Sequence, residues 1–305
     1  MAEASPKTAS PSQAVGRALT FVLLPSGTSI PLGPAWSAFC GALAADLTGL
    51  WQAETMLRLA LVILIAEVLW STWRALLVDM NWKEYISDHP LPLQGSSGYA
   101  PPYTAPGSPL GELLNGWRRF VRWTRETLPI ERRGTLLTLP VLPPLILLLS
   151  LLAGPELALL SLSALALSSL EWRLTQRGIK SYALRSVLEI GLSWLAGHIA
   201  FAPLTSSSFI LACCYSLAYQ GAIGLSQDLR AWSLALLFAG QAAALFIVVQ
   251  QRHPFTTPAA SIISLLLVPQ LLLLSHFCGH QRHVQYLRRS LPFLMVAMPV
   301  AAWMV

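Results

Sequence analysis

The sequence predicts an all-α protein that crosses a membrane about nine times. Hydrophobic residues make up 54% of the 305 residues and charged residues only 11%, whereas soluble domains carry about a quarter charged residues. Two runs without Asp, Glu, Lys or Arg extend over 38 residues from Ile190 to Gln227 and over 29 residues from His253 to Gln281. A helix needs roughly 20 apolar residues to cross a bilayer, and in lipid it satisfies its own backbone hydrogen bonds. We therefore expect these runs to form membrane-spanning helices.

In chain order, we expect residues 1–17 to form a disordered cytoplasmic tail, because "MAEASPKTASPSQAVG" is polar and does not lead into an apolar leader segment. Residues 18–305 form one transmembrane domain. Its expected helices cover residues 33–50, 55–80, 136–153, 156–172, 183–201, 207–226, 231–250, 256–277 and 288–304. The first is interrupted by Pro31, Pro34 and Asp46.

Basic residues gather in alternate loops, which places them on one side of the predicted membrane spans. The segment between the second and third helices carries Lys83, Arg118, Arg119, Arg122, Arg125, Arg132 and Arg133. Later loops on the same side carry Arg173, Arg177, Lys180, Arg185, Arg230, Arg282, Arg288 and Arg289. Because Lys and Arg favour the cytoplasmic side, we expect a cytoplasmic N-terminus and a C-terminus across the cytoplasmic (inner) membrane. The net charge of +6 matches anionic membrane lipid, and no nucleic-acid partner is expected.

Residues 95–133 form a cytoplasmic insertion in this scheme. The stretch "GSSGYAPPYTAPGSP" (95–109) has the composition of a linker, and residues 108–128 alternate apolar and arginine positions at helical spacing. The second stretch predicts an amphipathic helix that lies in the membrane interface. It either anchors the insertion to lipid, or serves as a lid or as a docking face for a protein partner.

An acidic segment, "DMNWKEYISDHPLPLQ" (79–94), follows the second predicted span. Asn81, Glu84 and Asp88 are three and four residues apart, so a helix would present them on one face. Carboxylate and amide oxygens are suitable ligands for Mg²⁺. The alternative is that Glu84 and Asp88 pair with Lys83 or with arginines at the headgroup level.

This segment resembles the first signature of the UbiA-type intramembrane prenyltransferases, N-D-x-x-D-x-x-x-D followed by R-P-L-P. The matching stretches are "MNWKEYISD" and "HPLP", in which His89 stands at the arginine position. The second family signature, D-x-x-D-x-x-G-D, corresponds to "YQGAIGLSQDLRAW" (219–232). Asp228 matches its last acid, but Gly221 and Gly224 stand where the earlier acids belong.

The resemblance implies a divergent enzyme that moves a polyprenyl group from its diphosphate to a lipophilic acceptor within the membrane. The implied catalytic residues are Glu84, Asp88 and Asp228. Mg²⁺, with fewer ions than is usual for the family, would be held by Asn81, Glu84, Asp88 and Asp228. The implied substrate-binding residues are Asn81, Arg74, Arg177, Lys180 and Arg230.

The eroded second signature supports an alternative function. The chain would then be a catalytically inactive UbiA-fold protein that binds a lipid, quinone or pigment, or is an accessory subunit of a larger membrane complex. In a second interpretation, Arg74 is the partner of Glu67. The loop residues Arg177 and Lys180 are, in that interpretation, charges that set the membrane topology. His198 is a candidate pigment ligand, or a histidine that is satisfied by a neighbouring helix. The set His276, Cys278, His280 and His283 is a candidate metal or haem site, or a polar cluster at the level of the lipid headgroups.

Overall fold

In the computed structural model of the chain, the described residues are 33–45, 52–78, 130–179, 181–226, 230–251, 256–278 and 283–305. Within these ranges all regular structure is helical and no strand occurs. The predicted tail (1–17) and the predicted insertion as far as residue 129 lie outside the described residues.

Helices occur at each of the nine predicted positions of the described chain. The first four positions are occupied by α2 (Pro34–Leu43), the continuous column α3 (Ala53–Ile63), η1 (Leu64–Trp70) and α4 (Ser71–Val78), then α7 (Ile130–Ala153) and α8 (Pro155–Gln176). The fifth is the column α9 (Tyr182–Ser186), η2 (Val187–Leu192) and α10 (Ser193–Ile199). The last four are α11 (Ser206–Ser226), α12 (Arg230–Gln250), α13 (Thr256–Cys278) and α14 (His283–Trp303).

Length and composition together identify candidate membrane spans among these helices. Among the described residues, five are long and apolar enough: Ala53–Val78, Pro155–Gln176, Ser206–Leu225, Ala231–Gln250 and Thr256–Ser275. The first helix, α2, has 10 residues and is therefore only about 15 Å long. It begins at Pro34 and gives way to a turn at Ala44, so the expected span over residues 33–50 is shorter than predicted. The helical membrane class is confirmed, whereas the total of nine spans stays a prediction.

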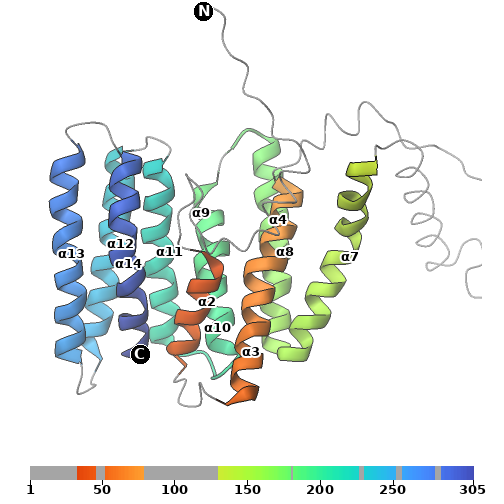
Figure 1. The fold of residues 1–305 in the computed structure, drawn as a ribbon, viewed down its shortest axis with the longest axis horizontal. Coiled ribbons are helices and arrows are strands. Elements are labelled where there is room, and N and C mark those ends of the chain that lie inside the picture. Colours follow the sequence, from red (N-terminus) through yellow and green to blue (C-terminus); the bar gives the residue numbers. More distant parts are fainter. Residues whose placement is uncertain are drawn as a thin grey trace, which may run out of the picture.

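The helices stand side by side as a broad array (Figure 1). α7 and α13 lie at its opposite edges, and α2 lies near the middle against α10. The α2–α10 contact depends on two glycines. A Cβ at Gly41 would lie 1.9 Å from the carbonyl oxygen of Trp194, and one at Gly197 would lie 1.9 Å from that of Ala38. Since no side chain fits there, the two backbones touch directly.

Polar side chains add specific contacts between helices. Gln241 of α12 and Gln270 of α13 donate to each other's side-chain oxygens at 3.1 and 3.0 Å, and both residues are buried. His198 of α10 is fully buried, and its two ring nitrogens lie 3.1 Å from Ser208 Oγ and 3.1 Å from the Pro203 carbonyl. This histidine therefore fastens the connection from α10 to α11, and neither ring nitrogen is left for a pigment or metal.

The glycine contact generates a testable prediction. We expect Gly197→Ala to lower the free energy of unfolding by about 1–3 kcal/mol, because the added methyl group must separate α2 from α10. Gly191→Ala in the same column is the matched control, since the nearest atom to its new Cβ is the side-chain oxygen of Ser216 at 2.8 Å. Both changes bring the same gain in helix propensity. Thermal unfolding in detergent would measure the difference, and equal losses for the two variants would contradict the packing account.

Candidate functional site

An ion pair joins α4 and α8 inside the bundle. Arg74 Nε donates to Glu171 Oε2 at 2.8 Å, and Arg74 Nη2 donates to Glu171 Oε1 at 2.9 Å. Two parallel bonds of this kind fix both the distance and the orientation of the planar groups. Glu171 is only 5% exposed. The pair therefore holds the last turns of α4 and α8 in one arrangement.

Glu189, in η2, connects this pair to Arg185, one turn earlier in the same column, and to α11. Its Oε1 accepts hydrogen bonds from Arg74 Nη1 at 3.2 Å and from Arg185 Nε at 2.8 Å. Its Oε2 accepts one from the hydroxyl of Tyr219, in α11, at 2.5 Å. One carboxylate therefore joins α4, α9 and α11. We call Arg74, Glu171, Arg185, Glu189 and Tyr219 the Glu189 network.

The formal charges of the Glu189 network cancel, with two arginines facing two glutamates. In a medium of low dielectric constant, an unpaired charge is strongly unfavourable, so such groups persist inside a membrane only when they are paired. Arg185 carries the most exposed side chain, at 42%, compared with 14% for Glu189. The network is thus a neutral cluster that opens toward solvent or headgroups at Arg185.

Two turns of π-helix shape this region. η1 contains Glu67 and η2 contains Glu189. At both places a serine hydroxyl donates to the carbonyl five residues earlier, Ser71 to Ala66 at 3.5 Å and Ser193 to Leu188 at 3.3 Å. A π turn shifts the helix face relative to a regular α-helix, and such turns often occur at functional sites.

Glu67 has a separate role at the start of α2. Its Oε2 accepts a hydrogen bond from the backbone N–H of Ala35 at 2.8 Å. The first N–H groups of a helix have no partner in their own helix, and a carboxylate there also complements the helix dipole. A Cβ at Gly33 would lie 3.2 Å from the same oxygen, so the residue before the helix is small. Glu67 therefore caps α2, while Arg74 pairs with Glu171 and Glu189.

A small cavity adjoins the Glu189 network. Its volume is about 10 Å³, and it is lined by Pro34, Ala66, Trp70, Ser71, Arg74, Ser168, Leu188 and Glu189. That volume corresponds to about one water molecule. In this form the cavity has no room for a diphosphate group.

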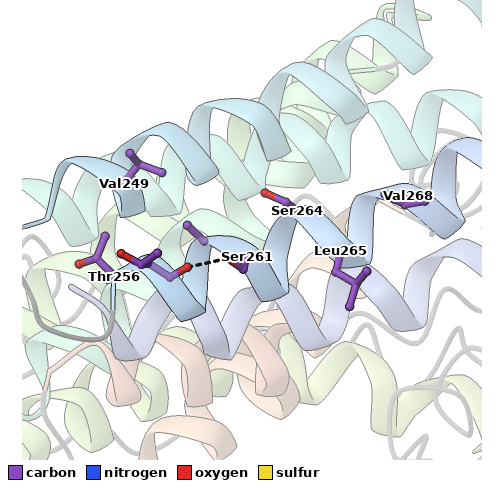
Figure 2. A pocket seen from close by; sticks show the side chains of 8 residues that line it. Val249, Thr256, Ser261, Ser264, Leu265 and Val268 are labelled. Atoms are coloured by element: carbon purple, nitrogen blue, oxygen red, sulfur yellow. Dashed lines mark hydrogen bonds between the residues drawn. The ribbon is translucent and has the colours of Figure 1, made fainter.

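A larger groove lies elsewhere, between the end of α12 and the first half of α13 (Figure 2). Its volume is about 610 Å³, and it is lined by Val249, Thr256, Thr257, Ala260, Ser261, Ser264, Leu265 and Val268. The Ser261 hydroxyl in this lining already donates a hydrogen bond to the Thr257 carbonyl within the same helix, at 2.9 Å. Its lining carries no charged side chain, so it offers nothing to hold a diphosphate. We therefore place the candidate site at the Glu189 network despite the greater volume of the groove.

The structure locates some of the residues predicted from the sequence. Arg74 belongs to the Glu189 network, and Arg177 is exposed in the turn that follows α8. Arg230 is the first residue of α12, where the structure describes its backbone. The remaining predicted site residues lie outside the described ranges: Asn81, Glu84, Asp88, Lys180 and Asp228.

The predicted metal ligands therefore stay a prediction. Among the side chains that the structure describes, no group of three or more His, Cys, Asp and Glu is placed to hold a metal ion. The side chains of His276, Cys278, His280 and His283 are outside that description.

Sequence reasoning missed Glu171 and Tyr219 as site residues. The available signal for Glu171 was an acid inside the otherwise apolar stretch "SALALSSLEW", because charges within predicted spans usually face the bundle interior. Tyr219 gave no such signal, since tyrosine is common in apolar helices.

Comparison of the chain with protein families, with curated proteins and with solved structures finds no match.

The Arg74–Glu171 pair is testable by a double-mutant cycle. Arg74→Met leaves Glu171 buried without its partner, and we expect the free energy of unfolding to fall by about 3–5 kcal/mol. Adding Glu171→Met removes the orphaned charge, so we expect the double variant to recover much of that loss. Thermal unfolding in the same detergent would measure Arg74→Met, Glu171→Met and the double variant. A double variant less stable than Arg74→Met would contradict the pairing.

Proposed function

We propose that the chain is a divergent UbiA-like prenyltransferase, a bundle of about nine membrane helices with a cytoplasmic N-terminus. It would transfer a polyprenyl group from its diphosphate to a lipophilic acceptor in the membrane. The proposal rests on the resemblance of residues 79–94 and 219–232 to the two family signatures. It is supported by the way the described helices lead into those two segments.

The supporting observation is the link between α4 and α11 through Glu189. α4 ends at Val78, directly before the first acidic segment, and α11 ends at Ser226, two residues before Asp228. Arg74 and Tyr219, one from each helix, both bind the Glu189 carboxylate. The helix that precedes residues 79–94 and the helix that precedes Asp228 are therefore linked through one carboxylate, and both end at the same end of the bundle (Figure 1).

The donor set of the proposed site suits Mg²⁺. Glu84, Asp88 and Asp228 provide carboxylates and Asn81 an amide oxygen, which are the ligand types that this cation prefers. When bound, the cation would stabilise the negative charge of the departing pyrophosphate. Arg177, Lys180 and Arg230 would add positive charge at the same end of the bundle. Arg74 donates to two carboxylates, so we assign it to positioning rather than to direct diphosphate binding.

A second function is favoured by the packing of Gly221. A Cβ at this position would lie 2.4 Å from the Ser233 carbonyl oxygen and 2.5 Å from the Leu237 backbone nitrogen, both in α12. An aspartate cannot replace Gly221 without separating α11 from α12, so the loss of this family acid is built into the packing. The cavity beside the Glu189 network, at about 10 Å³, is also too small for a diphosphate group. Both features suit a catalytically inactive UbiA-fold protein that binds a lipid, quinone or pigment, or that belongs to a larger complex.

Turnover assays test the enzyme directly. With prenyl diphosphates, Mg²⁺ and a panel of quinone, phenol and tetrapyrrole acceptors, we expect a prenylated product whose formation stops when the metal is chelated. Glu84→Gln and Asp88→Asn should each lower the rate by about 10²–10³-fold, the usual effect of losing a group that stabilises transition-state charge. Glu156→Gln, an exposed glutamate in the first turn of α8, is the matched control and should retain full activity.

Absence of product with every donor and acceptor, under conditions in which a UbiA-type enzyme turns over, would exclude the enzyme proposal. Purification in gentle detergent would then test the second function. An inactive protein that retains a pigment, a quinone or a stoichiometric protein partner supports that function, whereas a bare monomer contradicts it.

A further inference from the structure

The outward face of α8 is a stripe of exposed side chains that changes from apolar to basic along the helix. Its members recur every three or four positions, which is the spacing of one helix face. They are Leu159, Leu162, Ala166, Leu170, Arg173 and Arg177. Leu159 is 67% exposed and Leu170 is 44% exposed. Because α8 is a candidate membrane span, the apolar part of this stripe faces lipid.

The basic end of the stripe lies at the membrane boundary. The candidate span ends at Gln176, with Arg173 in its last turn and Arg177 directly after it. α8 ends at the same end of the bundle as α4 (Figure 1). Trp73 and Trp172 each stand next to a residue of the ion pair that joins these two helices, and tryptophan is typical of membrane interfaces. The two guanidinium groups therefore belong at the level of the lipid headgroups.

The turn after α8 fixes the place of Arg177. Gly178 has a φ of +78°, the left-handed conformation that closes many helices. The N–H of Ile179 donates to the Leu174 carbonyl at 3.0 Å, and the N–H of Gly178 donates to the Thr175 carbonyl at 2.9 Å. These bonds end the helix at Arg177 and leave Ile179 53% exposed. A charged and an apolar side chain thus meet the membrane boundary next to each other.

The charges of Arg173 and Arg177 are not neutralised by the residues that the structure describes. Within those residues, neither guanidinium forms a hydrogen bond or an ion pair. Glu171 is close in sequence, but it is buried and both its oxygens bind Arg74. Glu156, at the other end of α8, lies about 25 Å further along the helix, which is well beyond the screening distance of about 8 Å. The stripe therefore ends in two positive charges without a counter-charge.

We infer that the outward face of α8 binds an anionic phospholipid of the surrounding bilayer. The lipid phosphate lies between Arg173 and Arg177, which are one turn apart on the same face and offer the forked donors that suit phosphate. An acyl chain follows the stripe from Leu170 to Leu159. This apolar part is about 16 Å long, which matches one leaflet of a hydrocarbon core about 30 Å thick. The inference goes beyond the proposed function and does not rest on it.

Charge and shape together select this occupant. A zwitterionic lipid would cover the apolar stripe but bring no net negative charge to the arginines. A soluble phosphate or diphosphate would pair with the arginines but would not cover the apolar stripe. Arg177 is also among the residues that the family resemblance assigns to diphosphate binding, so the experiment has to separate the two sources of phosphate.

Native mass spectrometry of the full chain in detergent would measure the site, with dioleoylphosphatidylglycerol and dioleoylphosphatidylcholine as probes. The two lipids have the same acyl chains and differ in net headgroup charge. Each basic residue at an anionic membrane surface contributes about fivefold to binding. We therefore expect the first phosphatidylglycerol to bind about 25-fold more tightly than phosphatidylcholine. Arg173→Gln and Arg177→Gln should each weaken phosphatidylglycerol binding by about fivefold, and together by about 25-fold.

Arg58→Gln is the matched control, because it removes an exposed arginine in α3, near the opposite end of the bundle (Figure 1). It should keep the phosphatidylglycerol affinity within about twofold, as expected for a distant site. An excess of inorganic diphosphate should not displace the lipid from the unchanged protein.

Three results would overturn the lipid site. They are equal binding of the two lipids, equal losses in Arg177→Gln and Arg58→Gln, and displacement of phosphatidylglycerol by inorganic diphosphate. The last result would assign the arginines to a soluble phosphate ligand. The comparison of the two lipids on the unchanged protein decides the question even where a variant fails to fold. Selective loss of phosphatidylglycerol in the two α8 variants, together with resistance to diphosphate, supports the site.

Discussion

The carboxylate of Glu189 is the interaction on which the rest of the structure depends. It accepts hydrogen bonds from Arg74, Arg185 and Tyr219 in a region where an unpaired charge would be strongly unfavourable. Because Arg74 and Tyr219 lie on other helices than Glu189, the requirement to pair this charge also constrains how α4 and α11 are arranged around η2. Arg74 extends the constraint to Glu171 and hence to α8. The same hydrogen bonds thus neutralise the buried charges and hold the helices in place.

Close backbone packing also holds the helices in place, and it limits which side chains can stand at the contact positions. Gly41 and Gly197 let α2 touch α10, and Gly221 lets α11 touch α12. The last contact occurs where the second UbiA signature carries an acid. Under the proposed UbiA-like function, this packing leaves no room for an acid at position 221, which suits either a site with fewer cations or a protein without catalysis.

The membrane class and the helix positions could be predicted from the sequence because lipid leaves the backbone few alternatives to a helix. Pro31 and Pro34 predict an interruption of the first helix, but they do not predict that α2 has only 10 residues. The pairing of Arg74 with Glu171 and Glu189 could not be predicted. It depends on which faces of α4, α8 and η2 meet in the bundle, and the π turn that contains Glu189 departs from regular helical periodicity. The predicted site at Glu84, Asp88 and Asp228 follows from a sequence resemblance and stays a proposal.

The distance between positions 84 and 228 tests the central claim most directly. Spin labels at these two positions, in a chain whose four cysteines are replaced, would report that distance by pulsed electron paramagnetic resonance. If Glu189 holds the two helix ends together and the acidic segments converge, the labels should show one short, narrow distance distribution, which broadens with Glu189→Gln and not with Glu156→Gln. A long separation, or a broad distribution in the unchanged network, would contradict the shared site.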